Sequence, residues 1–125
     1  MLHEELTQKI IGCAMTVHRT LGTGFLESVY QNALTHELRK IGIEVACEKN
    51  IQVSYDGVVV GDFVVDLLVN ECILVENKAV LKLVAAHEAQ LVNYLTATGI
   101  EVGLLFNFGA SSLEYRRKSR VFRST

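Results

Sequence analysis

The chain has 125 residues, of which 50% are hydrophobic and 21% are charged, with no proline and a formal net charge of −2. Its length predicts a single domain over residues 1–125, and its composition excludes intrinsic disorder and an overtly basic nucleic-acid-binding protein. The longest stretches without a charged residue or histidine have 12 residues, whereas a membrane span needs roughly 20 apolar ones. We therefore expect a soluble protein without a membrane partner.

The predicted elements begin with two helices. Apolar residues recur at helical spacing over residues 3–20 and again over about 25–41. Gly22-Thr23-Gly24 separates the helices, because glycine favours the left-handed backbone conformations that end a helix. Gly42 ends the second helix in the same way.

The pattern then changes to that of strands. Residues 43–55, 58–69 and 72–80 are rich in β-branched residues, and the turn signals Asp56-Gly57 and Asn70-Glu71 separate them. A further helix and two further strands follow, over residues 82–98, 101–108 and 113–122. The order α-α-β-β-β-α-β-β predicts an α/β (α+β) protein with a mixed sheet and helices packed on it.

The three cysteines, Cys13, Cys47 and Cys72, show no C-x-x-C spacing. This argues against a disulfide framework and against a thiolate zinc site. Their small or apolar neighbours predict buried thiols. The N-terminal Met-Leu-His-Glu-Glu-Leu is acidic where a signal peptide would be basic. We therefore expect a reducing, cytoplasmic environment.

Charged residues interrupt two strands that are otherwise apolar on both faces. Asp66 lies within the second strand, and Glu76-Asn77-Lys78 lies within the third. Strands of this kind are expected to be covered on both sides, where an unpaired carboxylate costs several kcal/mol. Glu76 and Lys78 project from the same face, and the short turn brings Asp66 beside them.

Two carboxylates and a lysine suit phosphodiester hydrolysis. Carboxylate oxygens bind Mg²⁺ or Mn²⁺, which lowers the pKa of a bound water and neutralises charge on the phosphate. The lysine can orient that water or stabilise the developing oxyanion. The alternative is a cross-strand salt bridge at the edge of the sheet, and the strands alone do not decide between the two.

Two predicted helices carry polar residues that can complete such a site. Glu27 lies in the first turn of the second helix, with Tyr30 one turn later, although the helix macrodipole also favours an acid there. His87, Gln90 and Tyr94 share one stripe of the helix over 82–98. That stripe either faces the sheet or belongs to a solvent-exposed polar face.

The charge is unevenly distributed along the chain. Residues 116–125 contain five basic side chains and no acidic one, whereas residues 1–115 contain 7 basic and 14 acidic side chains. The basic end can contact phosphates, or it is a solvated terminal strand. The candidate phosphate contacts are Arg116, Arg117, Lys118 and Arg120, and Arg123 is the fifth basic residue of this end.

Several motifs occur together: Gly24-x-x-Glu27-x-x-Tyr30, Asp66, Glu76-x-Lys78, His87-Glu-Ala-Gln90-Leu-Val-Asn-Tyr94-Leu and Gly103-Leu-Leu-Phe-Asn-Phe-Gly109. With them the chain resembles the GxxExxY protein family, a branch of the PD-(D/E)XK nuclease superfamily, over nearly its whole length. The resemblance implies a single nuclease-like domain with a restriction-endonuclease-like core.

The resemblance also implies roles for the matching residues. Asp66 and Glu76 would ligate the metal with the Asn77 carbonyl as third ligand, and Glu27 would bind it directly or through water. Lys78 would position the attacking water. Gln90 would hold the substrate or the catalytic groups, and the supporting residues would be Tyr30, His87 and Tyr94. Asn77 departs from the family, which usually has an apolar residue there.

We therefore expect a Mg²⁺- or Mn²⁺-dependent nuclease with a catalytic set of Glu27, Asp66, Glu76, Lys78 and Gln90, acting on DNA rather than RNA. The alternative is a non-catalytic module that keeps the nuclease fold and binds nucleic acid or a protein partner. A third hypothesis places the charged strand residues in ion pairs at an oligomer interface. A homodimer is expected, because so small a domain has little surface with which to grip a duplex.

Overall fold

The computed structural model describes residues 1–120, and it contains the eight elements in the predicted order. The last strand is predicted to run to Phe122, and residues 121 and 122 lie outside the described residues. The elements are α1 (Glu4–Leu21), α2 (Glu27–Lys40), β1 (Val45–Tyr55), β2 (Val58–Val69), β3 (Ile73–Lys78), α3 (Ala85–Thr98), β4 (Val102–Asn107) and β5 (Glu114–Ser119).

The five strands form one mixed sheet in the order β1-β2-β3-β4-β5. β1, β2 and β3 form an antiparallel meander, β3 and β4 run parallel, and β5 returns antiparallel to β4. Helix α3 makes the crossover from β3 to β4 that a parallel pair requires. This topology confirms the predicted mixed sheet.

Both predicted turns between strands are confirmed. Asp56 and Gly57 have φ angles of 53° and 76°, and Asn70 and Glu71 have φ angles of 48° and 58°. Two consecutive positive φ angles are typical of the tight turns whose twist matches that of the flanking strands. The short turn at Asn70 fixes the register of β2 against β3, with Val69 opposite Ile73.

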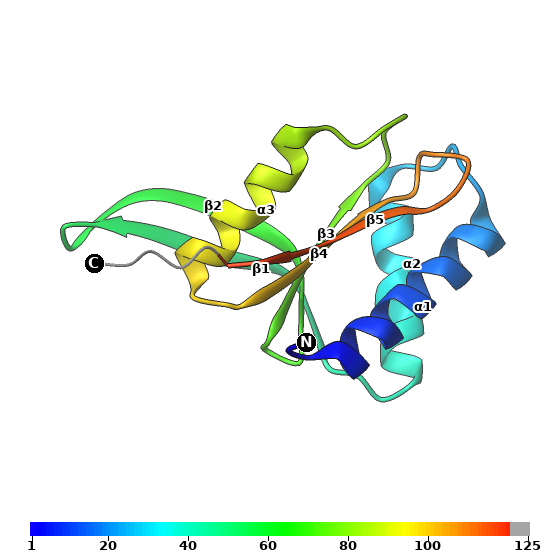
Figure 1. Cartoon of the computed structure of the whole chain (residues 1–125), viewed down its shortest axis with the longest axis horizontal. Coiled ribbons are helices and arrows are strands. Elements are labelled where there is room, and N and C mark those ends of the chain that lie inside the picture. Colours follow the sequence, from blue (N-terminus) through cyan, green and yellow to red (C-terminus); the bar gives the residue numbers. More distant parts are fainter. Residues whose placement is uncertain (121–125) are drawn as a thin grey trace.

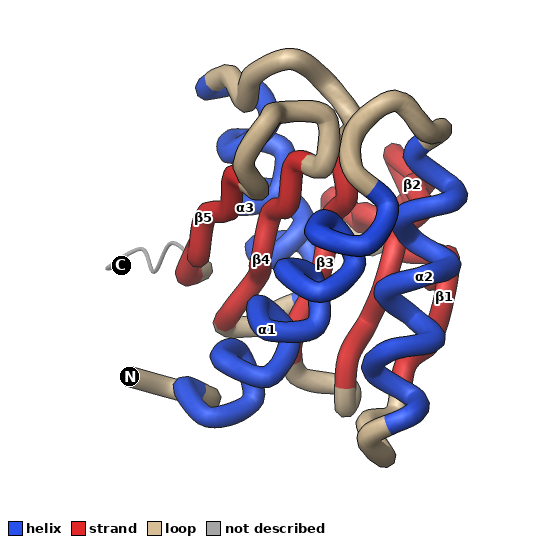
Figure 2. The backbone as a smooth tube through the Cα atoms, turned by 90° about the vertical axis from the view of Figure 1, so that its right-hand side faces the viewer, coloured by secondary structure: helices blue, strands red, loops and turns tan. Residues whose placement is uncertain are grey.

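The sheet is covered on both faces, by α1 and α2 on one side and by α3 on the other (Figures 1 and 2). The larger core lies under α1 and α2, and a smaller core that includes Leu91 and Leu95 lies under α3. Gly103 allows α3 to approach β4, because a Cβ there would lie 2.9 Å from Cδ1 of Leu91. None of the helices within residues 1–120 is long and apolar enough to cross a membrane.

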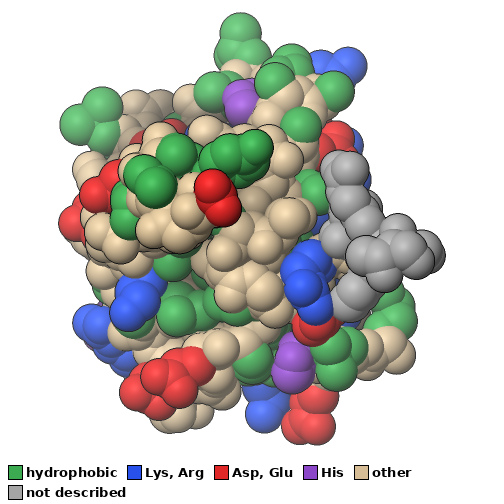
Figure 3. Space-filling view, turned by 90° about the vertical axis from the view of Figure 1, so that its left-hand side faces the viewer, with side chains coloured by type: hydrophobic (Ala, Val, Ile, Leu, Met, Phe, Trp, Pro, Cys, Tyr) green, Lys and Arg blue, Asp and Glu red, His purple; other side chains and the backbone are tan. Residues whose placement is uncertain are grey.

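The prediction that β2 is covered on both faces is correct only for its second half. β1 and β2 form a long hairpin that extends beyond the helices (Figure 1), and Val58, Val59 and Val60 of its outer half are 51–61% exposed. Figure 3 looks at this end of the molecule and shows apolar side chains among charged ones at the surface. The outer half of β2 is exposed because the helices do not reach it.

The predicted burial of the three thiols is wrong for Cys47 and only partly correct for Cys13 and Cys72. Cys47 is exposed, and Cys13 and Cys72 are half-buried. Cys47 lies on β1, at one edge of the sheet, and its Sγ lies 3.6 Å from the hydroxyl of Thr35. The apolar neighbours of Cys47 in the sequence predicted a buried thiol, but they carry no information about whether another element covers this edge strand. Burial raises the pKa of the Cys13 and Cys72 thiols.

Candidate active site

The predicted site residues come from the carboxyl end of β3 and from the helices that begin beside it. Glu76, Asn77 and Lys78 are the last three residues of β3, and Glu27 is the first residue of α2. The views in Figures 1 and 2 place the first turns of α2 and α3 near this end of the sheet. The helices α2 and α3 therefore begin near the end of the sheet at which β3 finishes.

Asp66 and Glu76 lie side by side where β2 and β3 separate. The last backbone pair between these strands is Leu67 with Val75, and the two carboxylates occupy the next facing positions. The backbone N–H of Asp66 donates to Oε1 of Glu76 over 2.9 Å, and the N–H of Asn77 donates to Oδ2 of Asp66 over 2.7 Å. Each carboxylate thus replaces a backbone acceptor of the ladder and keeps its second oxygen for another partner.

Burial and nearby negative charge make these carboxylates hard to ionise. Glu76 is only 5% exposed, and burial, then the charge of Asp66, raise its pKa to about 7. Burial also raises the pKa of Asp66, and the N–H of Asn77 and the charge of Lys78 offset part of this rise. Raised carboxyl pKa values in a charge cluster are typical of functional sites.

Glu27 and Lys78 belong to the same electrostatic cluster. Burial and the charge of Asp66 raise the pKa of Glu27, while Lys78 and His87 oppose the rise. Within residues 1–120, Lys78 forms no direct ion pair with a carboxylate. Its ammonium is near enough to lower the pKa of three acids without being tied to any of them.

The paired carboxylates fit a hard divalent cation. Mg²⁺ is typically bound through one or two carboxylates and keeps several waters, and a cation would relieve the repulsion that raises the pKa of Glu76. In the described part of the chain, no three His, Cys, Asp or Glu side chains are grouped so that they could hold a metal ion. Glu27, Asp66 and Glu76 therefore do not form a preassembled three-carboxylate set.

The backbone and the side chain of Asn77 have different surroundings. Its backbone N–H supports Asp66, whereas its side chain is fully buried, and neither Oδ1 nor Nδ2 has a hydrogen-bond partner among the described residues. A buried amide without partners destabilises a fold. The backbone of Asn77 serves the site, and its side chain does not.

Tyr30 holds the turn that precedes Glu27. Its hydroxyl donates to the carbonyl of Gly22 over 2.6 Å and accepts from the N–H of Phe25 over 3.2 Å. Its ring is fully buried and stacks on Phe108, with centroids 4.8 Å apart. The Gly-x-x-Glu-x-x-Tyr spacing therefore places Tyr30 one helical turn after Glu27, where its hydroxyl can hold the loop that precedes Glu27.

The stripe on α3 faces the sheet only in part. Tyr94 is half-buried and stacks on Phe63 of β2 with centroids 4.1 Å apart. Burial and the charges of Glu76 and Asp66 raise the pKa of the Tyr94 hydroxyl. His87 is half-buried, and its Nδ1 accepts from the N–H of Val84 over 3.1 Å. The side chain of Gln90 is exposed.

Two of the basic residues predicted to contact phosphate are paired with acids of this chain. Lys118 lies 2.6 Å from Glu88 of α3, and Arg120 lies 2.6 Å from Glu101. The sequence offered no sign of these pairs, because Glu88 and Glu101 are 30 and 19 residues away from their partners along the chain. The basic end of the chain therefore carries less free charge than its composition indicates.

The other candidates for phosphate contact differ in their surroundings. Arg117 donates to the backbone carbonyl of Leu2, and Arg116 is exposed and donates to the carbonyl of Tyr115. Arg123 lies outside the described residues. Arg116 is therefore the best placed of these residues to contact a phosphate from solvent.

Sequence analysis missed a buried polar clamp behind the site. Oδ1 of Asn107 accepts from the N–H groups of Val80 and Gly109, both over 3.0 Å. Its Nδ2 donates to Oε1 of Glu114 over 2.8 Å, and the same oxygen accepts from the N–H of Leu83 over 3.1 Å. This Asn107–Glu114 clamp fixes the loop that follows Lys78. Asn107 interrupts an apolar strand just as Asp66 does, so the same signal would have found it.

Glu48 of β1 is a second residue that the sequence did not indicate. It has a φ of 52°, unusual for a residue other than glycine, and it interrupts the ladder of β1 and β2 between Cys47 and Lys49. Its charge raises the pKa of Asp66. The register of β1 on β2 therefore places a further acid opposite Asp66.

Comparisons with known proteins agree with this fold. The family model of the PD-(D/E)XK nuclease superfamily matches residues 4–118, which also confirms the predicted restriction-endonuclease-like core. A structure described as "Crystal structure of SSO0001" is similar, with a TM-score of 0.58 and 14% sequence identity over 97% of this chain. The chain spans 61% of that protein's length, and identity this low shows the fold alone. No curated protein matches the chain. The chain belongs to the PD-(D/E)XK nuclease superfamily.

Proposed function

We propose that this protein is a divalent-cation-dependent nuclease of the GxxExxY branch that hydrolyses phosphodiester bonds of DNA. The observation that carries the proposal is the pairing of Asp66 with Glu76 beside the ammonium of Lys78. Each carboxylate gives one oxygen to a backbone N–H and keeps one for a cation.

Asp66, Glu76 and the carbonyl of Asn77 would hold Mg²⁺ or Mn²⁺, with Glu27 acting through a water. When bound, such a cation lowers the pKa of a water and neutralises negative charge on a phosphodiester. The backbone N–H groups hold both carboxylates in place before substrate arrives, so little reorganisation is needed.

Lys78 would orient the attacking water and stabilise the charge that develops on the phosphate. A compact ammonium suits this role, and Lys78 has no carboxylate partner within the described residues that would compete for it. Gln90 is exposed on α3 and would contact the substrate strand.

The proposal is tested with plasmid and single-stranded DNA in the presence of Mg²⁺ or Mn²⁺. Lys78→Ala should lower the cleavage rate by about 100-fold or more, as expected for the loss of an electrostatic catalytic group. Lys82→Ala is the matched control, because Lys82 is exposed in the loop that follows β3. Equal cleavage by the wild type and Lys78→Ala would overturn the proposal, since a contaminant would then explain it.

The second candidate function is a nuclease-fold module that binds without cleaving. The observation that favours it is the modest basic charge, because Lys118 and Arg120 are paired with Glu88 and Glu101. This candidate predicts no cation-dependent cleavage by any variant and tight retention of a nucleic acid or protein partner in pull-downs.

A further inference from the structure

A cavity of about 540 Å³ lies next to the residues proposed for catalysis. Three segments line it, and two of them adjoin site residues: one segment directly follows Lys78, and another ends two residues before Glu27. The lining residues are Thr23, Gly24, Phe25, Ala79, Val80, Leu81 and Gly109. A ligand in this cavity would therefore reach the reacting phosphate through a short connection.

The walls of the cavity are held in place by the contacts described above. The Tyr30 hydroxyl bonds both ends of the Gly22–Phe25 turn, and Asn107 bonds the N–H groups of Val80 and Gly109. A Cβ on Gly109 would lie 2.3 Å from the carbonyl oxygen of Val80, so only glycine allows this close approach. Ligand sites are usually pre-formed in this way.

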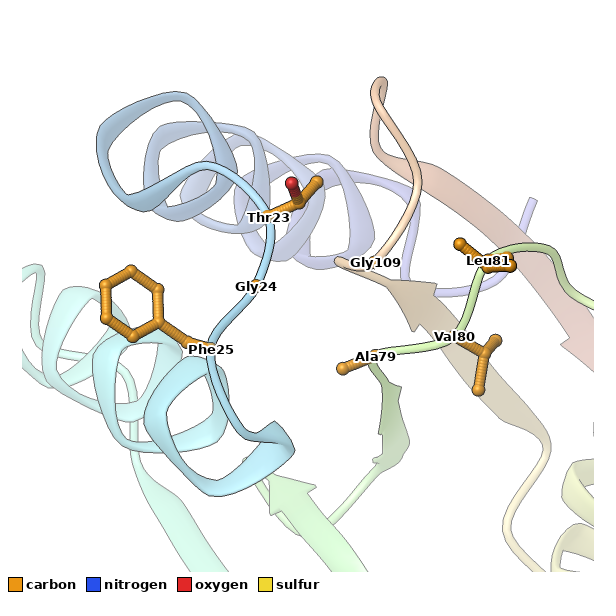
Figure 4. Close-up of a pocket in the computed structure, with 7 residues that line it drawn as sticks. All are labelled: Thr23, Gly24, Phe25, Ala79, Val80, Leu81 and Gly109. Carbon is orange, nitrogen blue, oxygen red and sulfur yellow. The ribbon is translucent and has the colours of Figure 1, made fainter.

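The lining of the cavity is uncharged. None of its seven residues carries a charge, so the lining offers a phosphate no basic side chain. Figure 4 shows the two loops facing one another, with the Phe25 ring turned away from Ala79–Leu81. Leu81 is 92% exposed and Phe25 is 48% exposed. An apolar rim around a pocket with a hydroxyl and backbone polar groups suits a flat, uncharged heterocycle.

A base in a continuous duplex can enter such a cavity only after it is flipped out of the stack, whereas an unpaired base avoids most of that cost of a few kcal/mol. We propose that the cavity receives an unpaired nucleobase next to the scissile phosphate, so that the substrate is a strand with unpaired nucleotides. This inference rests on the proposed function for its link to cleavage.

The test uses single-stranded oligonucleotides, the matching blunt duplex, and a series in which one abasic nucleotide moves along the strand. The wild type with Mg²⁺ or Mn²⁺ should cleave the single strand about tenfold or more faster than the duplex. An abasic nucleotide at one position near the cut should lower kcat/KM about tenfold, as expected for the loss of one stacked base.

Thr23→Trp should remove the sensitivity to the abasic position by filling the cavity. Thr96→Trp, at an exposed position of α3, should retain it. Leu81→Asp provides a second variant that cannot disturb the core, because Leu81 is 92% exposed, and it should also reduce the sensitivity. Circular dichroism confirms that each variant is folded.

Fluorescence anisotropy with Lys78→Ala separates this inference from the proposed function. Tighter binding of the single strand than of the duplex, with the same abasic sensitivity, supports the inference even if no variant cleaves. Cleavage of duplex and single strand at equal rates, with no dependence on the abasic position, overturns the inference and leaves the nuclease proposal standing. Equal affinity of Lys78→Ala for every oligonucleotide also overturns it.

Discussion

The backbone N–H of Asp66 donates to Oε1 of Glu76 over 2.9 Å, so the strand that carries one carboxylate orients the other. The reciprocal support comes from the N–H of Asn77, which donates to Oδ2 of Asp66 over 2.7 Å. This exchange takes place one position beyond the last backbone pair of β2 and β3. Backbone N–H groups of β2 and β3 therefore hold the two carboxylates together at the point where the strands separate.

The acidic pair makes stability depend on pH in the metal-free protein. Folding raises the pKa of Glu76 from 4.5 to about 7, so between these values the folded state binds a proton that the unfolded chain lacks. The free energy of unfolding therefore falls as pH rises through this window, by at most about 3 kcal/mol. The raised pKa values of Asp66 and Glu27 act in the same direction.

Urea unfolding at about pH 5 and about pH 8 measures this dependence. Glu76→Gln should remove most of it and should be more stable than the wild type at the higher pH. Glu71→Gln, in the exposed turn between β2 and β3, should keep the wild-type dependence. A Glu76→Gln profile parallel to that of the wild type would show that Glu76 ionises normally.

Tyr30→Phe keeps the stacked ring but removes the hydroxyl that bonds Gly22 and Phe25. We expect a loss of about 1–2 kcal/mol in the free energy of unfolding, since two hydrogen-bonding groups lose their partner. Cleavage should slow as well, because the turn before Glu27 loosens. Tyr55→Phe is the control, since Tyr55 is 74% exposed, and it should match the wild type. Unchanged stability in Tyr30→Phe would refute the role given to the hydroxyl.

Asn77→Leu should stabilise the protein. The side-chain amide is fully buried without a partner among the described residues, so an apolar side chain of similar size should raise the free energy of unfolding by about 1–2 kcal/mol. Cleavage should be unaffected, because the backbone groups of Asn77 remain. Urea unfolding and a cleavage assay check both statements, and a destabilised variant would mean that the amide is satisfied.

Asn107→Ala should destabilise the protein by about 2–3 kcal/mol, because it leaves the N–H groups of Val80 and Gly109 without their acceptor. It should also slow cleavage by releasing the loop after Lys78. Asn93→Ala, at an exposed position of α3, should change stability by less than about 0.5 kcal/mol. Similar effects of the two substitutions would argue against the clamp.

The acidic pair could be predicted from the sequence because local features determine it. Two apolar strands joined by a tight turn have only one register that keeps their apolar faces buried. That register places Asp66 and Glu76 at facing positions. The turn itself was visible in Asn70-Glu71, so neither step needed information from a distant part of the chain.

Features that depend on distant segments could not be predicted. The apolar outer half of β2 resembles a buried strand, and only the short reach of the helices leaves Val58–Val60 exposed. The pairing of Lys118 with Glu88 depends on how α3 lies against β5. The cavity needs three loops that are far apart in sequence. Composition carries no information about any of these arrangements.

The central claim is that Asp66 and Glu76 hold a divalent cation, and calorimetric titration with Mn²⁺ tests it most directly. Asp62→Asn is the matched control for Asp66→Asn, because Asp62 lies exposed on the same strand. The wild type and Asp62→Asn should each bind Mn²⁺ at one site, and Asp66→Asn, shown to be folded by circular dichroism, should lose that binding. Identical isotherms for Asp66→Asn and the wild type would contradict the claim.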